Sequence, residues 1–216
     1  MKSLVVALAL ALAVAARSVS AQAKCLEQVK FPPVGRWAQY QAVYKEDPYT
    51  LRYAVIGVEP RGGKSLQWVE MRMKGKKPNQ NMIYQMLVPG SLMEMSQVQE
   101  IVFKPAEKPA MKMSGPMLSM IRGELQKQSF YGDMCKGVTL VGKEKVTVPA
   151  GSFQALHFRS EEHGSDSWIS SIIPFSLVKS TGKDYKVELT AQGRGAKSSI
   201  TEKPQEMPRM GTAPSR

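Results

Sequence analysis

The stretch Leu-Gln-Trp-Val-Glu-Met-Arg-Met-Lys, residues 66–74, alternates apolar and polar side chains with a period of two. In an extended strand, successive side chains point to opposite faces of the sheet. The apolar side chains Val69, Met71 and Met73 therefore lie on one face, and the charged side chains Glu70, Arg72 and Lys74 lie on the other. We expect the first face to be buried and the second to be in water.

Runs of the same kind lie on both sides of this stretch, separated by Gly, Pro, Asn and Asp. They predict strands over residues 37–44, 51–58, 81–88, 98–103, 138–148, 153–159, 167–173, 177–179 and 185–192. Asp47-Pro48 is expected to turn the chain between the first two, and residues 104–113 to form an exposed connection.

One segment has helical rather than strand periodicity. Ser114 can cap it, Pro116 suits its first turn, and the spacing predicts a helix to Gln128. Its expected packed face consists of Met117, Met120, Ile121 and Leu125. The fold class is therefore mainly β, a curved antiparallel sheet or incomplete barrel packed around one central helix.

The N-terminus has the form of a cleavable secretory signal. Lys2 precedes an unbroken run of Leu, Val and Ala at residues 4–16, shorter than the roughly 20 residues of a spanning helix. The small-x-small patterns Val19-Ser20-Ala21 and Ala21-Gln22-Ala23 predict cleavage before Gln22 or Lys24, and we favour Gln22. We expect residues 1–21 to be a signal peptide, 22–202 one β-rich domain, and 203–216 a disordered tail. The mature protein is then periplasmic or secreted.

The two cysteines, Cys25 and Cys135, both follow the signal segment and would reach an oxidising compartment. We expect them to form a disulfide, with two unpaired thiols as the alternative, because sequence does not show whether they come within bridging range. A bridge closing this loop would stabilise the protein by about 4 to 5 kcal/mol in the chain-entropy model.

Basic residues outnumber acidic ones, 30 against 18, for a formal net charge of +12. Such a surface attracts anionic partners, and in an exported protein these are an anionic membrane surface or another envelope component. Aromatic residues make up 7% of the chain and the lysines are dispersed, so we expect no nucleic-acid binding.

A resemblance to a known class rests on the second half of the chain. The segment Val-Thr-Val-Pro-Ala-Gly-Ser-Phe-Gln-Ala-Leu, residues 146–156, is followed by Asp-Ser-Trp-Ile-Ser at 166–170, Ile-Pro-Phe at 173–175, Val178-Lys179 and Leu189. Over residues 137–200 this pattern resembles bacterial periplasmic domains of unknown function that are similar to the lipoprotein-carrier, or Lol-like, fold. The resemblance implies an incomplete antiparallel barrel whose apolar concavity, capped by helices, holds acyl chains in the carriers.

Catalytic motifs are absent from the sequence. The histidines are His157 and His163, and no Gly-x-Ser-x-Gly elbow or phosphate-binding glycine motif occurs. We interpret His157 as a structural or surface residue, and Glu161, Glu162, His163 and Asp166 as a solvated turn, since they lack a recognised metal-ligand spacing. The chain is expected to be no enzyme and to need no cofactor or metal.

Methionine is unusually frequent, with 14 residues and Met-x-Met at 71/73, 93/95 and 111/113. Three interpretations stay open. The side chains could fill an ordinary core, line a cavity that adapts to varied apolar ligands, or offer thioethers to Cu(I) through Met93, Met95, Met111 and Met113.

These observations predict an exported protein that binds an apolar or amphiphilic ligand, an acyl chain or lipid, in the concavity of its sheet. The alternative is an envelope structural or assembly factor that binds anionic lipid or a protein partner through its basic surface, and Cu(I) binding ranks third. The candidate lining residues share an apolar or aromatic character: Trp37, Tyr40, Met71, Met73, Met82, Met86, Met117 and Trp168.

Overall fold

The computed structural model describes residues 21–90, 97–113, 115, 117–120, 122 and 134–207. Twelve strands within these ranges form one sheet. Their bounds are β1 Trp37–Tyr44, β2 Asp47–Arg61, β3 Lys64–Lys74, β4 Met82–Val88, β5 Glu100–Pro105, β6 Met111–Met113, β7 Val138–Val148, β8 Gly151–Ser160, β9 Ser165–Ile169, β10 Leu177–Gly182, β11 Tyr185–Gly193 and β12 Gln205–Glu206. A short 3₁₀ helix, η1, covers Pro78–Gln80.

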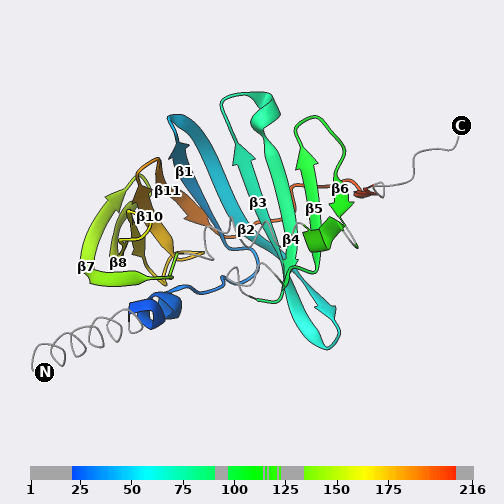
Figure 1. Ribbon diagram of the computed structural model, residues 1–216. Coiled ribbons are helices and arrows are strands. Elements are labelled where there is room, and N and C mark those ends of the chain that lie inside the picture. Colours follow the sequence, from blue (N-terminus) through cyan, green and yellow to red (C-terminus); the bar gives the residue numbers. More distant parts are fainter. Residues whose placement is uncertain are drawn as a thin grey trace, which may run out of the picture.

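The strand order is β12-β6-β5-β4-β3-β2-β1-β11-β10-β9-β8-β7 (Figure 1). The chain runs as a meander from β1 at the centre to β6, crosses to β7 at the opposite edge, and returns as a second meander to β11, which pairs with β1. After β11 the chain crosses the sheet again to place β12 beside β6. The predicted mainly β fold is confirmed as an open sheet, antiparallel except for the parallel β12–β6 pair.

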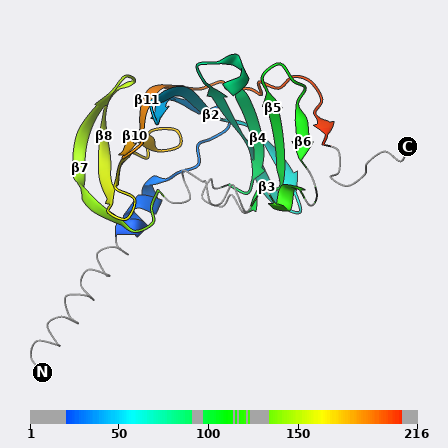
Figure 2. The same cartoon turned by 45° about the horizontal axis from the view of Figure 1, so that its top comes forward.

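Seen end on, the sheet is an arch whose two legs are the β7–β8 hairpin and strands β4 to β6 (Figure 2). The chain between residue 28 and β1 runs inside the arch, and so does the connection between β9 and β10. Val29, Phe31 and Phe175, from these two segments, pack in the same apolar core as the concave face of the sheet. The inside of the arch is therefore partly filled by the chain itself.

Strong alternation gave accurate strand predictions, since β1 and β7 have the predicted bounds. The turn predicted at Asp47-Pro48 is wrong. The chain turns at Lys45 and Glu46, which adopt left-handed φ angles of 45° and 72°, and Asp47 already pairs with Tyr44. Both turn residues have φ above zero, as a two-residue hairpin turn whose twist matches the strands requires.

The helices differ from the prediction. Residues 21–28 form a helix that the sequence analysis did not anticipate. Residues 115, 117–120 and 122 are helical, but Met120, predicted on the packed face, is 58% exposed and Leu118 is buried in its place. The rest of the segment to Gln128 lies outside the described residues, so a central helix of the predicted length is not confirmed.

Cys25 and Cys135 form the predicted disulfide, with their Cα atoms 5.6 Å apart. Cys25 belongs to the 21–28 helix, and Cys135 lies in the turn just before β7. Both residues are buried in the core. The bond therefore fastens the N-terminal helix to the chain segment that enters the far edge of the sheet.

Residues 194–207, which we call the C-terminal arm, cover part of the outer face of the sheet. It runs from β11 across β3, β4 and β5 and ends as β12 on the edge of β6. Ile200 packs with Val102 and Ala110 in a second, smaller apolar cluster. Gln205 and Glu206 were assigned to a disordered tail, but their backbone pairs with β6; residues 208–216 lie outside the described residues.

The expectation that residues 104–113 are an exposed connection is wrong at its end. Ala110 is fully buried, and Met111–Met113 forms β6, paired with β5 on one side and with the C-terminal arm on the other. The predicted signal peptide lies outside the described residues except for Ala21.

Candidate functional site

The concave face of β2 to β6 carries three parallel cross-strand rows of apolar side chains. In an antiparallel sheet, residues directly opposite one another point to the same face. The innermost row is buried: Val55, Val69, Met86, Ile101 and Met113. The two outer rows are only half-buried: Tyr53, Met71, Tyr84, Phe103 and Met111, and Leu51, Met73 and Met82. Apolar surface thus continues outward from the core along the inside of one leg of the arch.

An aromatic cluster marks the boundary between these rows and the filled part of the arch. The Tyr53 ring centroid lies 6.2 Å from that of Tyr40 and 5.7 Å from that of Phe175. Phe175 in turn contacts Phe31 edge to face at 6.4 Å. Partial burial raises the pKa of Tyr53 to about 12, because desolvation disfavours the ionised phenol.

Five of the eight predicted lining residues share the concave face, and two others, Met117 and Trp168, pack against the apolar core. Tyr40, Met71, Met73, Met82 and Met86 share the concave face through consecutive cross-strand pairs, and Met117 packs against the same core. Sequence reasoning missed Tyr84 and Phe103, which lie between Met71 and Met111 in the same row. Their positions in alternating strands were the available signal.

Trp37 is on the other face of the sheet, which corrects its predicted place. It pairs with Ala54 and Gly193. Trp37 lies three positions before Tyr40 in β1, and an odd separation along a strand places two side chains on opposite faces. Its indole Nε1 donates to the Arg194 carbonyl oxygen at 3.2 Å, and the Arg52 guanidinium lies 4.7 Å from the ring centroid. Trp37 therefore contributes a cation–π contact on the outer face and no apolar lining.

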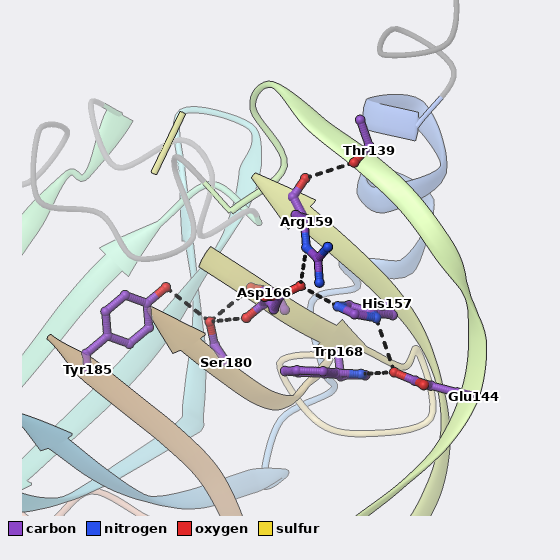
Figure 3. Close-up of polar contacts among 9 residues, drawn as sticks. Thr139, Glu144, His157, Arg159, Asp166, Trp168, Ser180 and Tyr185 are labelled. Atoms are coloured by element: carbon purple, nitrogen blue, oxygen red, sulfur yellow. Dashed lines mark hydrogen bonds and ion pairs between the residues drawn. The ribbon is translucent and has the colours of Figure 1, made fainter. Parts of the chain in front are cut away.

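Trp168 is also on the opposite face from Tyr40, in a cluster of charged residues (Figure 3). Its cross-strand partners are His157 and Lys179, and the Lys179 ammonium lies 5.1 Å from its ring centroid. The His157 ring stacks on it with centroids 4.4 Å apart and planes at 19°. Alternation separates the two faces of a strand but does not say which face is inside, and this explains the wrong placement.

His157 has a carboxylate against each of its ring nitrogens. Nδ1 lies 3.2 Å from a Glu144 oxygen, and Nε2 lies 2.6 Å from Asp166 Oδ1 (Figure 3). The same Asp166 oxygen accepts a hydrogen bond from Arg159 Nε at 2.9 Å, and the Trp168 indole donates to Glu144.

Asp166 is the centre of this cluster. Burial opposes its ionisation, but the hydrogen bonds from His157 and Arg159 outweigh it and hold the pKa of the Asp166 carboxyl below its usual value. Asp166 thus belongs to β9 and joins it to β8, rather than to a solvated turn with the exposed Glu161, Glu162 and His163. The cluster ties β7, β8 and β9 together.

Neither a metal-ion cluster nor a membrane-spanning helix occurs in the part of the chain that the structure describes. No three His, Cys, Asp or Glu side chains gather there in an arrangement that could hold a metal ion. No helix among the same residues has the length and apolar character needed to cross a membrane. Of the methionines considered for Cu(I), Met111 and Met113 lie on the concave face, and Met93 and Met95 lie outside the described residues.

No protein-family model and no curated protein matches this sequence. Solved structures resemble it partially. A protein from Bacteroides fragilis described as exported, with a YmcC-like fold, is 9% identical with a TM-score of 0.39, over 77% of this chain and 99% of that one. A protein from Parabacteroides distasonis described as a lipoprotein is 11% identical with a TM-score of 0.39, over 76% and 97%.

MucB is a further structural neighbour. It is 11% identical with a TM-score of 0.43, and the match covers 84% of this chain and 61% of MucB. MucB in complex with MucA(peri) gives 10% identity and the same TM-score, over 86% and 59%. The present chain thus spans about three-fifths of the length of MucB. These neighbours share the fold of this chain in part.

Proposed function

We propose that this chain is an exported protein of the bacterial envelope that binds an apolar or amphiphilic ligand, such as an acyl chain, on the concave face of its arched sheet. The supporting observation is the pair of half-buried apolar rows beside the buried one, since an ordinary core would not leave eight adjacent apolar side chains partly open to solvent.

The composition of these rows suits such a ligand. Met71, Met73, Met82 and Met111 are unbranched and polarisable, so they can repack around chains of different shape. The aromatic rings of Tyr53, Tyr84 and Phe103 supply more rigid apolar area between them. Binding by burial of apolar surface needs no catalytic group, which agrees with our proposal that the protein is not an enzyme.

The first test is native mass spectrometry of protein purified from an exporting host, with solvent extraction of the same sample. We expect wild-type protein to carry a stoichiometric lipid, and Met71→Glu/Met82→Glu to lose it. A carboxylate at these two positions would have to be desolvated against the bound chain, which is strongly unfavourable. Affinity for a fluorescent fatty acid should fall by at least about tenfold, equal to about 1.4 kcal/mol.

The matched control is Leu26→Glu/Val141→Glu, which adds the same two charges at apolar positions that are 43% and 54% exposed. This variant should keep the lipid. If the methionine double variant folds and still retains the lipid, the concave face is not the binding site. A wild-type protein that carries no lipid and does not bind the fatty acid would favour the alternative, an envelope assembly factor that acts through its basic surface.

A further inference from the structure

A separate pocket of about 560 Å³ lies between the loop that precedes β1 and the loop that joins β9 to β10. Its size is in the range of small-molecule sites. Three kinds of residue line it: apolar side chains from both loops, three cations, and one serine. The lining residues are Lys30, Phe31, Pro32, Pro33, Val34, Arg36, Ser171, Ile172, Ile173, Pro174 and Arg194.

A hydrogen bond joins the two loops. The Lys30 backbone N–H donates to Ser176 Oγ at 3.1 Å, and Ser176 is fully buried. Phe175 and Ser176 both adopt left-handed φ angles, 64° and 62°, which are unfavourable for residues other than glycine. Such backbone conformations persist only where the surrounding structure fixes them. The walls of the pocket are therefore preformed.

The cations of the pocket have no partners. Lys30, Arg36 and Arg194 make no ion pair with any residue that the structure describes, and no acidic residue lines the pocket. Elsewhere on the protein, Arg61 and Arg159 are paired with carboxylates. Unneutralised positive charge beside a concave surface focuses the electrostatic field and attracts anions.

The apolar part of the pocket is also incomplete. Ile173 is buried, but Ile172 is 68% exposed and Val34 is 50% exposed at the rim. Two large aliphatic side chains thus face solvent beside three unpaired cations. A ligand with an anionic end and an apolar end would satisfy both parts of this surface at once.

We propose that this pocket binds an anionic amphiphile, with a carboxylate or phosphate head paired to Arg36 and Arg194 and an apolar chain against Phe31, Val34 and Ile172. Arg36 and Arg194 come from adjacent strand ends, because Trp37 pairs with Gly193. Guanidinium groups bind planar oxyanions through two parallel hydrogen bonds. The pocket is distinct from the half-buried rows on the concave face and does not depend on a ligand there.

The test is calorimetric titration of protein purified after export of the full chain, with monomeric dodecanoate as the probe and dodecyl maltoside as the uncharged comparison. We expect dodecanoate to bind and Arg36→Gln/Arg194→Gln to weaken it by about tenfold or more, since charge-assisted hydrogen bonds are lost. The matched control is Lys45→Gln/Lys183→Gln. It removes the same charge from another pocket of about 560 Å³, at the β1–β2 and β10–β11 turns, which also contains Glu46 and Asp184. The affinity of this control variant for dodecanoate should equal that of the wild-type protein.

Equal weakening in both double variants would overturn the proposal, because it would show a general effect of charge. Equal affinity for dodecyl maltoside would also overturn it. If the arginine double variant does not fold, Ile172→Ser, a substitution at an exposed position, replaces it as the test. Weaker dodecanoate binding by this variant supports the proposal, and unchanged binding counts against it.

Two further experiments identify the binding site of dodecanoate and the natural source of the anionic head group. In Met71→Glu/Met82→Glu, which removes the proposed concave-face site, the part of dodecanoate binding that depends on Arg36 and Arg194 should remain; its loss would place dodecanoate on the concave face and overturn the present proposal while supporting the former one. Co-sedimentation with phosphatidylglycerol vesicles, compared with phosphatidylcholine vesicles, tests a membrane lipid as the source. Arginine-dependent binding to either dodecanoate or phosphatidylglycerol supports the pocket, and binding to neither overturns it.

Discussion

Glu70 lies in the middle of β3 with no exposed surface, although alternation places it on the face expected to be in water. Both of its carboxylate oxygens accept hydrogen bonds. Oε2 accepts from Gln85 Nε2 at 2.9 Å and from the Ser199 backbone N–H at 2.8 Å, and Oε1 accepts from Ser199 Oγ at 2.7 Å. Through these contacts the carboxylate holds the C-terminal arm against the sheet.

We predict that Glu70→Ala lowers the free energy of unfolding by about 2 to 4 kcal/mol, because the buried donors of Ser199 and Gln85 lose a charged acceptor. Urea denaturation measures this change, and hydrogen exchange at the Ser199 amide should become faster. Arg72→Ala, two residues along the same face but exposed, should change stability by less than about 0.5 kcal/mol. Wild-type stability and exchange in Glu70→Ala would show that the arm is held by other contacts.

At the scale of elements, β12 protects an edge of the sheet. Gln205 N–H donates to the Ala110 carbonyl at 2.9 Å, and Met207 N–H donates to the Lys112 carbonyl at 3.0 Å. Lys104 pairs with Glu202 just before this strand. Without β12, β6 would present unpaired backbone groups that other chains can pair with.

We predict that a chain ending at Lys203 associates in a concentration-dependent way, whereas a chain ending at Met207 behaves as the full chain. The two differ only in the four residues that include β12. Light scattering coupled to size-exclusion chromatography measures the mass of each. The same mass for both truncated chains at every concentration would mean that β12 does not protect this edge.

At the scale of the whole molecule, one disulfide joins positions 110 residues apart. It connects the N-terminal helix to the entry of β7, the strand at one edge of the sheet. The bond therefore restricts the unfolded chain over the whole first meander.

We predict that Cys25→Ala/Cys135→Ala lowers the free energy of unfolding by about 4 to 5 kcal/mol, the chain-entropy value for a loop of this length. This is a large share of the roughly 5 to 15 kcal/mol that stabilises a typical domain. Urea denaturation measures it, and wild-type protein in reducing buffer should give the same midpoint as the variant. A change below about 1 kcal/mol would mean that the unfolded chain is already restricted without the bond.

The sequence by itself determined the class of the fold. Alternation over residues 37–44, 66–74 and 138–148 fixes strands because it depends only on the local period of two, and β1 and β7 have their predicted bounds. The two cysteines and the apolar methionine positions of β3 and β4 were also evident from composition and spacing.

Only the tertiary structure decided what covers each face. Glu70 is buried because the C-terminal arm, about 130 positions further along the chain, packs over it. Trp37 and Trp168 point away from the concavity because the segments that pack against the sheet determine which of its faces is the inner one. The pocket beside Arg36 and Arg194 likewise joins residues more than 150 positions apart. Periodicity is a local property, whereas burial and unpaired charge depend on which distant segments meet.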